Sequence, residues 1–253
     1  MTKEIPFLMV AAGYSNYTRE YPAYIEKFGQ ENVQWTTNAG RYSIEDHIDE
    51  LKSKLPIDRP YIITGHSMGG SIIIELMNKE PLVNCRGVSI VGSSRIQPSH
   101  WFLNFLFYLP VPIIYLFFGL MALSFPITLI VTRFNFHKAV QASFDGIARL
   151  IENGARKMKK EYNGCLRKIG KNVHGILEEN KNIPTLFIHL KKDMLVDDED
   201  LEYTKAFFNV RKERIIPADT IHLTHDFDNL VADILGEELD FFGYEKMETK
   251  IAE

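Results

Sequence analysis

The sequence has few cysteines and no long hydrophobic run near its amino terminus. Only two of its 253 residues are cysteine, Cys85 and Cys165, which is too few for a disulfide-stapled secreted domain. Their spacing fits no metal-binding motif, so we expect two free thiols. The first apolar run, 7–12, is shorter than the hydrophobic region of a secretory signal peptide. We therefore expect a cytoplasmic location, with peripheral contact to a membrane as a further option.

Charged residues are absent from 101–132 and unevenly distributed over the rest of the chain. The formal net charge is only −4, yet 133–192 carries 13 Lys and Arg against 5 Asp and Glu, and 193–253 carries 17 acids against 6 bases. Apolar residues at 45% and charged residues at 25% are ordinary for a globular protein and exclude a disordered chain. A chain of this length can bury one large core that carries an insertion.

Strand-like and helix-like segments alternate along most of the chain. Apolar or β-branched runs predict strands at 5–12, 32–37, 61–63, 87–91, 185–190 and 214–216. Apolar spacing predicts helices at 19–28, 44–55, 72–77, 201–208 and 227–235. Ser43, with Asp46 three residues later, is a candidate capping box for the second of these helices. This alternation predicts an α/β fold, a mainly parallel sheet of about six strands covered by helices on both faces.

A glycine-rich corner is the most informative local feature. Gly65-His66-Ser67-Met68-Gly69 follows one strand-like run and precedes the helix-like run 72–77. Glycines on both sides of a serine allow a strained, closely packed corner that exposes the hydroxyl at the carboxyl end of a sheet. The stretch resembles the nucleophile elbow of the α/β-hydrolase superfamily, which implies that Ser67 is a nucleophile and that His66 is structural. The alternative is an ordinary glycine-rich turn.

A serine nucleophile needs an imidazole to accept its proton and a carboxylate to orient that imidazole. In the superfamily these groups follow in the order serine, acid, histidine, each in a loop after a strand. Asp193 and His222 fit that order and are our candidates for the acid and the base. The alternatives are three acids at the start of the next helix and a second histidine: Asp197, Asp198, Asp200 and His225. Helix capping and the helix dipole would also explain those acids.

The resemblance further implies an oxyanion hole made by the backbone amides of Met68 and Tyr14. Two features depart from the superfamily pattern. The usual His-Gly before the second amide is Ala12-Gly13 here. Members also usually begin with an antiparallel strand pair before the strand that leads into the oxyanion loop, whereas that strand begins near Ile5 here. We therefore expect a shortened sheet whose edge needs protection by another device.

A long insertion lies where this fold carries its cap, so we predict a hydrolase core at 1–94 and 182–253 and a cap at 95–181. Within the cap, 101–132 contains no charged residue or histidine, and nine of its 32 residues are aromatic. Two membrane crossings, which would keep Ser67 and Asp193 on one side, need about 40 residues. Pro110, Pro112 and Pro126 also interrupt the run. A lid or an interfacial hairpin is therefore favoured over a transmembrane span.

The segment 147–169 has apolar residues at helical spacing and basic residues mostly elsewhere, which predicts a basic amphipathic helix. Gly154 and Gly164 are points where it could be interrupted. Such helices lie on anionic membrane surfaces, or pack as solvated cap helices on a core. Nucleic-acid binding is not favoured, because no recognition motif accompanies the basic residues.

These features together predict a serine esterase or lipase, similar to monoacylglycerol lipases, that cleaves lipophilic acyl esters through an acyl-enzyme and needs no metal or organic cofactor. A serine at position 67 argues against dehalogenase and epoxide-hydrolase chemistry, which use a carboxylate nucleophile in this superfamily. The alternatives are an acyl-thioesterase, a carbon-carbon bond hydrolase, or a catalytically silent relative that binds lipid or protein.

Overall fold

The centre of the molecule is a six-stranded parallel sheet. This computed structural model describes residues 7–13, 21–37, 40–96, 105, 107–116, 154–190, 196–216 and 227–242, with the backbone alone for 21–23, 190, 227–233 and 239. The strands lie in the order β2-β1-β3-β4-β5-β6, and all neighbours are parallel. They are β1 (Phe7–Ala11), β2 (Val33–Trp35), β3 (Tyr61–His66), β4 (Cys85–Val91), β5 (Thr185–Leu190) and β6 (Arg211–Ile216). The predicted fold class is confirmed.

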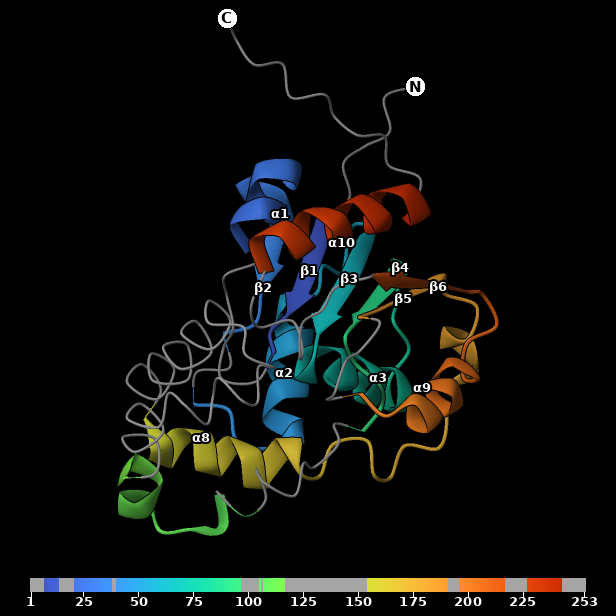
Figure 1. Cartoon of the computed structure of the whole chain (residues 1–253). Helices are drawn as coiled ribbons and strands as arrows, with labels where there is room; N and C mark the ends of the chain where they lie inside the picture. Colours follow the sequence, from blue (N-terminus) through green and yellow to red (C-terminus); the bar gives the residue numbers. More distant parts are fainter. Residues whose placement is uncertain are drawn as a thin grey trace, which may run out of the picture.

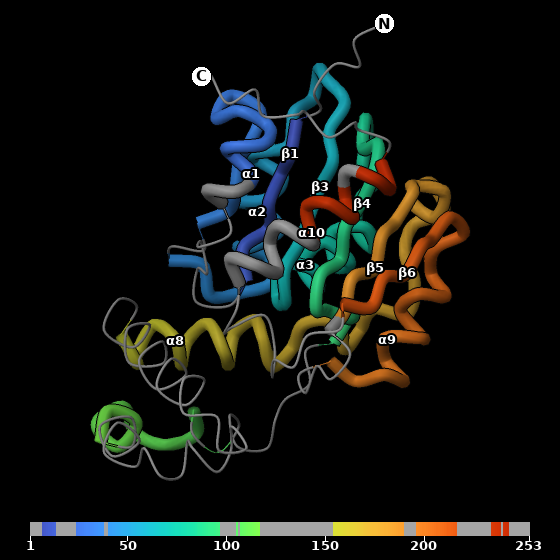
Figure 2. Tube along the Cα trace, turned by 45° about the horizontal axis from the view of Figure 1, so that its top comes forward, coloured from blue at the N-terminus to red at the C-terminus, as the bar shows by residue number. Residues whose placement is uncertain are grey.

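Helices cover both faces of the sheet, as Figures 1 and 2 show. One face packs against α1 (Tyr21–Phe28) and α10 (Phe227–Phe242), and the other against α2 (Ile44–Lys54), α3 (Met68–Lys79) and α9 (Asp198–Lys205). Successive strand residues point to opposite faces. In β1, Leu8 and Val10 therefore join the core cluster of α1 and α10, whereas Met9 and Ala11 join the larger cluster that contains α2, α3 and α9 residues.

The start of α2 follows the predicted capping box. The amide of Asp46 donates to Ser43 Oγ at 3.1 Å, and the amide of Ser43 donates to the Asp46 carboxylate at 3.1 Å. Hydrogen bonds from the amide of Tyr42 and from Ser43 hold the pKa of the Asp46 carboxyl below its usual value. The helix therefore begins at Ile44 because two of its otherwise unsatisfied groups are bonded at that point.

Several elements are longer than the sequence pattern predicts, and β6 and α10 are two of them. The strand β6 begins at Arg211 rather than at residue 214, because all six of its residues pair with β5 even though the first three are charged. The helix α10 continues to Phe242 rather than ending near 235, and the Phe242 ring packs against Gly87 of β4. Backbone pairing with β5 thus accompanies the longer β6, and the contact of Phe242 with β4 accompanies the longer α10. Neither interaction is visible in the apolar spacing of the sequence.

The two sheet edges are protected by strand length and by charge. At one edge β2 has only three residues. At the other edge the first five residues of β6 are exposed, and they include three bases and one acid that discourage pairing with another strand. These are the devices that the shortened sheet was expected to need.

The described part of the predicted cap includes residues 105 and 107–116 and the stretch 154–181, which contains the helix α8 (Ala155–Glu161). Gly154 precedes α8 at a φ of 72°, a left-handed conformation that an α-helix cannot include, and the π-helical turn Tyr162–Leu166 follows it. One face of this stretch is buried, as the apolar spacing predicts, through Ala155, Met158, Tyr162 and Ile169. None of the described helices is long and apolar enough to cross a membrane. The division into core and cap stays a prediction.

Candidate active site

Ser67 forms the corner between β3 and α3. Its backbone angles, φ 52° and ψ −122°, are rare for a residue with a side chain and store strain. The Ser67 amide donates to the carbonyl of Val91 on β4 at 2.9 Å, and the amide of Gly70 donates to the Ser67 carbonyl at 3.0 Å. The neighbouring residues 61–66 and 68–70 are buried, whereas Ser67 is half-buried. The predicted strand-serine-helix corner is present, and its role as nucleophile stays a prediction.

Three glycines allow this corner to pack. A Cβ on Gly65 would lie 2.6 Å from the backbone at Gly69 and Gly70, and a Cβ on Gly70 would lie 2.7 Å from Ser93 Cβ. A Cβ on Gly69 would lie 2.1 Å from the carbonyl oxygen of Ala11. Since real Cβ atoms do not approach other atoms so closely, the first turn of α3 can touch the end of β1 only with glycine at this position.

The backbone that follows β1 is fixed from the side of β2. The amide of Ala12 donates to Thr36 Oγ1 at 2.8 Å, and the amide of Thr36 donates to the carbonyl of Val10 at 3.0 Å. The first amides of a helix lack acceptors within that helix, and Met68 is the first residue of α3. Its role as an oxyanion donor stays a prediction. Tyr14, the second predicted donor, lies outside the described residues.

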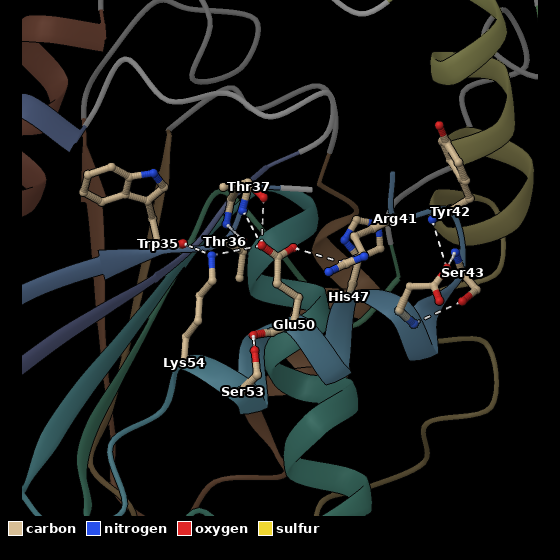
Figure 3. Close-up of polar contacts among 12 residues, drawn as sticks. Trp35, Thr36, Thr37, Arg41, Tyr42, Ser43, His47, Glu50, Ser53 and Lys54 are labelled. Carbon is tan, nitrogen blue, oxygen red and sulfur yellow. Dashed lines mark hydrogen bonds and ion pairs between the residues drawn. The ribbon is translucent and has the colours of Figure 1, made fainter. Parts of the chain in front are cut away.

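A buried carboxylate anchors the loop after β2, as Figure 3 shows. Glu50 of α2 accepts hydrogen bonds from the Thr37 amide at 2.7 Å, from Thr37 Oγ1 at 2.9 Å and from Lys54 Nζ at 3.0 Å. Arg41 Nε lies 3.8 Å from its other oxygen. Burial raises the pKa of Glu50, but these hydrogen bonds outweigh burial and hold it below its usual value. The charged carboxylate thus fixes Thr37, next to the residue that supports Ala12.

The predicted acid and base, Asp193 and His222, and the alternative base His225 lie outside the described residues. Their flanking elements are described. The strand β5 ends three residues before Asp193, and α10 begins five residues after His222. The strands β3, β4 and β5 are parallel neighbours, so their carboxyl ends lie at the same edge of the sheet. The chain that leads to Asp193 therefore leaves β5 at the edge where Ser67 lies.

Two of the alternative acids have structural roles. Asp197 caps α9 by accepting a hydrogen bond from the Asp200 amide at 2.9 Å. Asp200 accepts hydrogen bonds from Arg95 Nε at 2.7 Å and from the Ile96 amide at 3.1 Å, and so ties α9 to the chain that leaves β4. Asp198 is exposed in the first turn of α9. Capping and ion pairing account for these acids, and Asp193 remains our candidate.

A buried polar cluster beneath the corner was missed by the sequence analysis. Tyr24 Oη lies 3.2 Å from His66 Nε2, and Thr64 Oγ1 donates to Glu238 Oε1 at 2.7 Å. Burial raises the pKa of Glu238, against the opposing effects of Ser89, Thr64, His66 and Tyr24. The contacts agree with a structural role for His66. Helical spacing from Ile234 places Glu238 on the buried face of α10, and this was the one signal that could have identified it.

The described residues offer no metal site, since no three or more His, Cys, Asp or Glu side chains among them are grouped to hold an ion. Cys85 and Cys165 are free thiols, as predicted. Burial raises the pKa of Cys85 to about 12 and also raises that of Cys165 above its usual value. Both thiols are therefore protonated at neutral pH, which argues against either acting as a nucleophile.

Comparison with solved structures identifies the fold. A lipase-esterase related protein from Clostridium acetobutylicum superposes with a TM-score of 0.61 at 16% identity, covering 93% of this chain and 96% of that one. A hydrolase from Oleispira antarctica has a TM-score of 0.61 at 12% identity, covering 93% and 91%. The RedJ thioesterase of Streptomyces coelicolor has a TM-score of 0.58 at 16% identity, covering 92% and 85%. No protein-family model and no curated protein sequence matches the chain. The chain therefore has the α/β-hydrolase fold, as its resemblance to that superfamily implied.

Proposed function

We propose that the protein is a serine hydrolase that cleaves lipophilic carboxylic esters. The observation that carries the proposal is the strained backbone of Ser67 at a glycine-packed corner between a central strand and a helix. A strained residue persists only where the surrounding structure holds it, and in this fold that corner serves to present a nucleophile. A half-buried hydroxyl at the carboxyl edge of the sheet fits this use.

In the proposed mechanism Ser67 Oγ attacks the ester carbonyl carbon while His222 accepts its proton and Asp193 holds the imidazole. The negative charge on the carbonyl oxygen is stabilised by the backbone amides of Met68 and Tyr14. The carbon-oxygen bond to the alcohol breaks, and the alcohol leaves with the proton from His222. Water then attacks the acyl-enzyme by the same route, which releases the acid and restores Ser67.

The substrate class follows from the cap. The segment 101–132 is apolar and aromatic, and such a cap favours acyl chains over charged substrates. Cys165, in the predicted cap, lies with its Sγ 3.9 Å from Met68 Sδ at the start of α3, which supports contact between the cap and the candidate site. Medium-chain or long-chain acyl esters, of the monoacylglycerol type, are therefore the proposed substrates.

A thioesterase is the second candidate function, because the same three residues would cleave an acyl thioester and a thioesterase is among the proteins that share the fold. Hydrolysis of nitrophenyl esters of increasing chain length, run beside acyl-CoA substrates of the same lengths, separates the two. We expect ester hydrolysis that rises with chain length. Activity on thioesters alone would reject the ester assignment.

Variants test whether Ser67 carries the reaction. We expect Ser67→Ala to lower kcat about 10⁴-fold or more, since the residual rate comes from binding and oxyanion stabilisation alone. Ser53→Ala in the last turns of α2, where the hydroxyl donates to the Glu50 carbonyl, is the matched control and should keep wild-type kcat. Full activity of Ser67→Ala would contradict the proposal.

A further inference from the structure

The exposed large apolar side chains of the protein are not scattered evenly. Ten are exposed among the described residues, and five of them lie in the segment 105–116. The most exposed of these five are Tyr108 at 84%, Leu116 at 61% and Phe105 at 54%. Single exposed apolar residues are normal on a monomer, but a cluster of this kind marks a contact surface.

The segment is anchored on its other side. Phe107 and Ile114 are buried against Ala155, Met158 and Tyr162, and the rings of Phe107 and Tyr162 lie 4.8 Å apart between centroids. The segment 105–116 therefore has one apolar side that packs on the α8 region and a second apolar side that faces outward. Core packing accounts for the first side only.

Basic residues are concentrated in the neighbouring stretch that contains α8. Residues 154–177 carry seven Lys and Arg and a single acid, Glu161, which is buried with its Oε1 3.8 Å from His47 Nε2. Arg156, Lys157 and Lys160 are exposed on α8. Every exposed Lys, Arg, Asp or Glu side chain of this stretch is therefore a base.

The basic and apolar parts adjoin each other. The amide of Ala155, directly before Arg156, donates to Tyr115 Oη at 3.1 Å, and Lys159 Nζ donates to the carbonyl of Leu109 at 2.6 Å. These two hydrogen bonds join α8 directly to the segment that carries the exposed apolar side chains. We call the set Phe105, Tyr108, Leu116, Arg156, Lys157 and Lys160 the cap surface.

We propose that the cap surface binds the surface of an anionic lipid bilayer. A bilayer of this kind offers phosphate charge and hydrocarbon at nearly the same depth, which suits lysine and arginine beside tyrosine, phenylalanine and leucine. An acidic protein surface without apolar residues would match the charge but not the apolar side chains. Figure 1 shows α8 beyond the carboxyl ends of the strands, so a bound bilayer would face the edge of the sheet that carries Ser67.

Binding can be tested without any assumption about hydrolysis. Co-sedimentation is measured with vesicles of phosphatidylcholine containing one quarter phosphatidylglycerol and with vesicles of phosphatidylcholine alone. The charge variant is R156E/K157E, and the apolar variant is Tyr108→Ser with Leu116→Ser. The matched control is Val83→Ser with Arg86→Glu, because both residues are exposed near the amino end of β4, at the opposite end of the sheet from Ser67. Thermal unfolding establishes that each variant is folded.

We expect binding to the anionic vesicles that weakens as salt is added. Each basic residue near the bilayer contributes about fivefold in partitioning. The charge variant, which reverses two charges, should therefore bind at least about 25-fold more weakly, the apolar variant should also lose binding, and the control should bind like wild type. Equal binding to both kinds of vesicle, or anionic binding unchanged in the charge variant, would overturn the proposal. So would a wild-type dimer that the apolar variant dissociates, since the cap surface would then join two copies of the chain.

Discussion

Replacing Gly69 with alanine tests how closely the candidate site depends on backbone packing. The added Cβ would lie 2.1 Å from the carbonyl oxygen of Ala11 and 2.9 Å from that of Ala12. Both neighbours are backbone atoms at the end of β1, so no side chain can rotate away, and α3 and β1 must separate by about 1 Å. Ala11 and Ala12 shortly precede Tyr14 in the sequence, and Met68 directly precedes the substituted residue. The separation therefore pulls the two proposed oxyanion donors apart.

We expect Gly69→Ala to lower the free energy of unfolding by about 1–3 kcal/mol, the usual range for overpacking. A misplacement of about 1 Å in a site of this kind lowers kcat about 100-fold. Chemical denaturation gives the first quantity, and hydrolysis of a nitrophenyl ester gives the second. Gly236→Ala in α10 is the matched control, because a Cβ there meets nothing within 4 Å. It should raise stability by about 0.5–1 kcal/mol, since glycine is unfavourable within a helix. Wild-type stability and kcat in Gly69→Ala would refute the reasoning.

Three further predictions concern stability. Burial lowers the pKa of His47 from 6.5 to about 4, so the folded state favours the neutral imidazole. The free energy of unfolding should therefore fall by roughly 3 kcal/mol as the pH drops from about 6.5 to about 4. His47→Gln should lose that dependence in urea titrations across this range, and an identical pH profile for both proteins would contradict the assignment. Ser43→Ala removes the cap of α2 and should lower stability by about 1 kcal/mol by denaturation; a change near zero would show that Asp46 alone sustains the helix start. Burial raises the pKa of Glu238, so stability should be lost as pH rises through its folded-state pKa. Glu238→Gln should flatten that decline, and a variant as pH-sensitive as wild type would exclude Glu238 as its source.

The fold was readable from the sequence where local signals and burial agree. Each residue of β5 is apolar or β-branched apart from one histidine, and its predicted bounds, 185–190, match those observed. Ser43 and Asp46 marked the start of α2 because capping is a local interaction. The charged half of β6 had no such signal, since its strand state depends on pairing with β5 across the sheet.

The candidate site was only partly readable for the same reason. The corner at Ser67 is formed by consecutive residues, so its position was predicted from the motif. The contacts that support it join distant segments, such as Ala12 with Thr36 and Thr64 with Glu238. These pairs are separated by 24 and 174 positions, and no periodicity in the sequence connects them.

Labelling with a fluorophosphonate tests the role of Ser67 most directly. This reagent forms a covalent bond with a serine whose hydroxyl is activated by a neighbouring base. The native protein should gain the mass of one adduct, mapped to the peptide that contains Ser67, and both Ser67→Ala and the urea-unfolded wild type should gain none. A folded wild-type protein that takes up no label, or that carries the label at another serine, would contradict the assignment of Ser67 as the nucleophile.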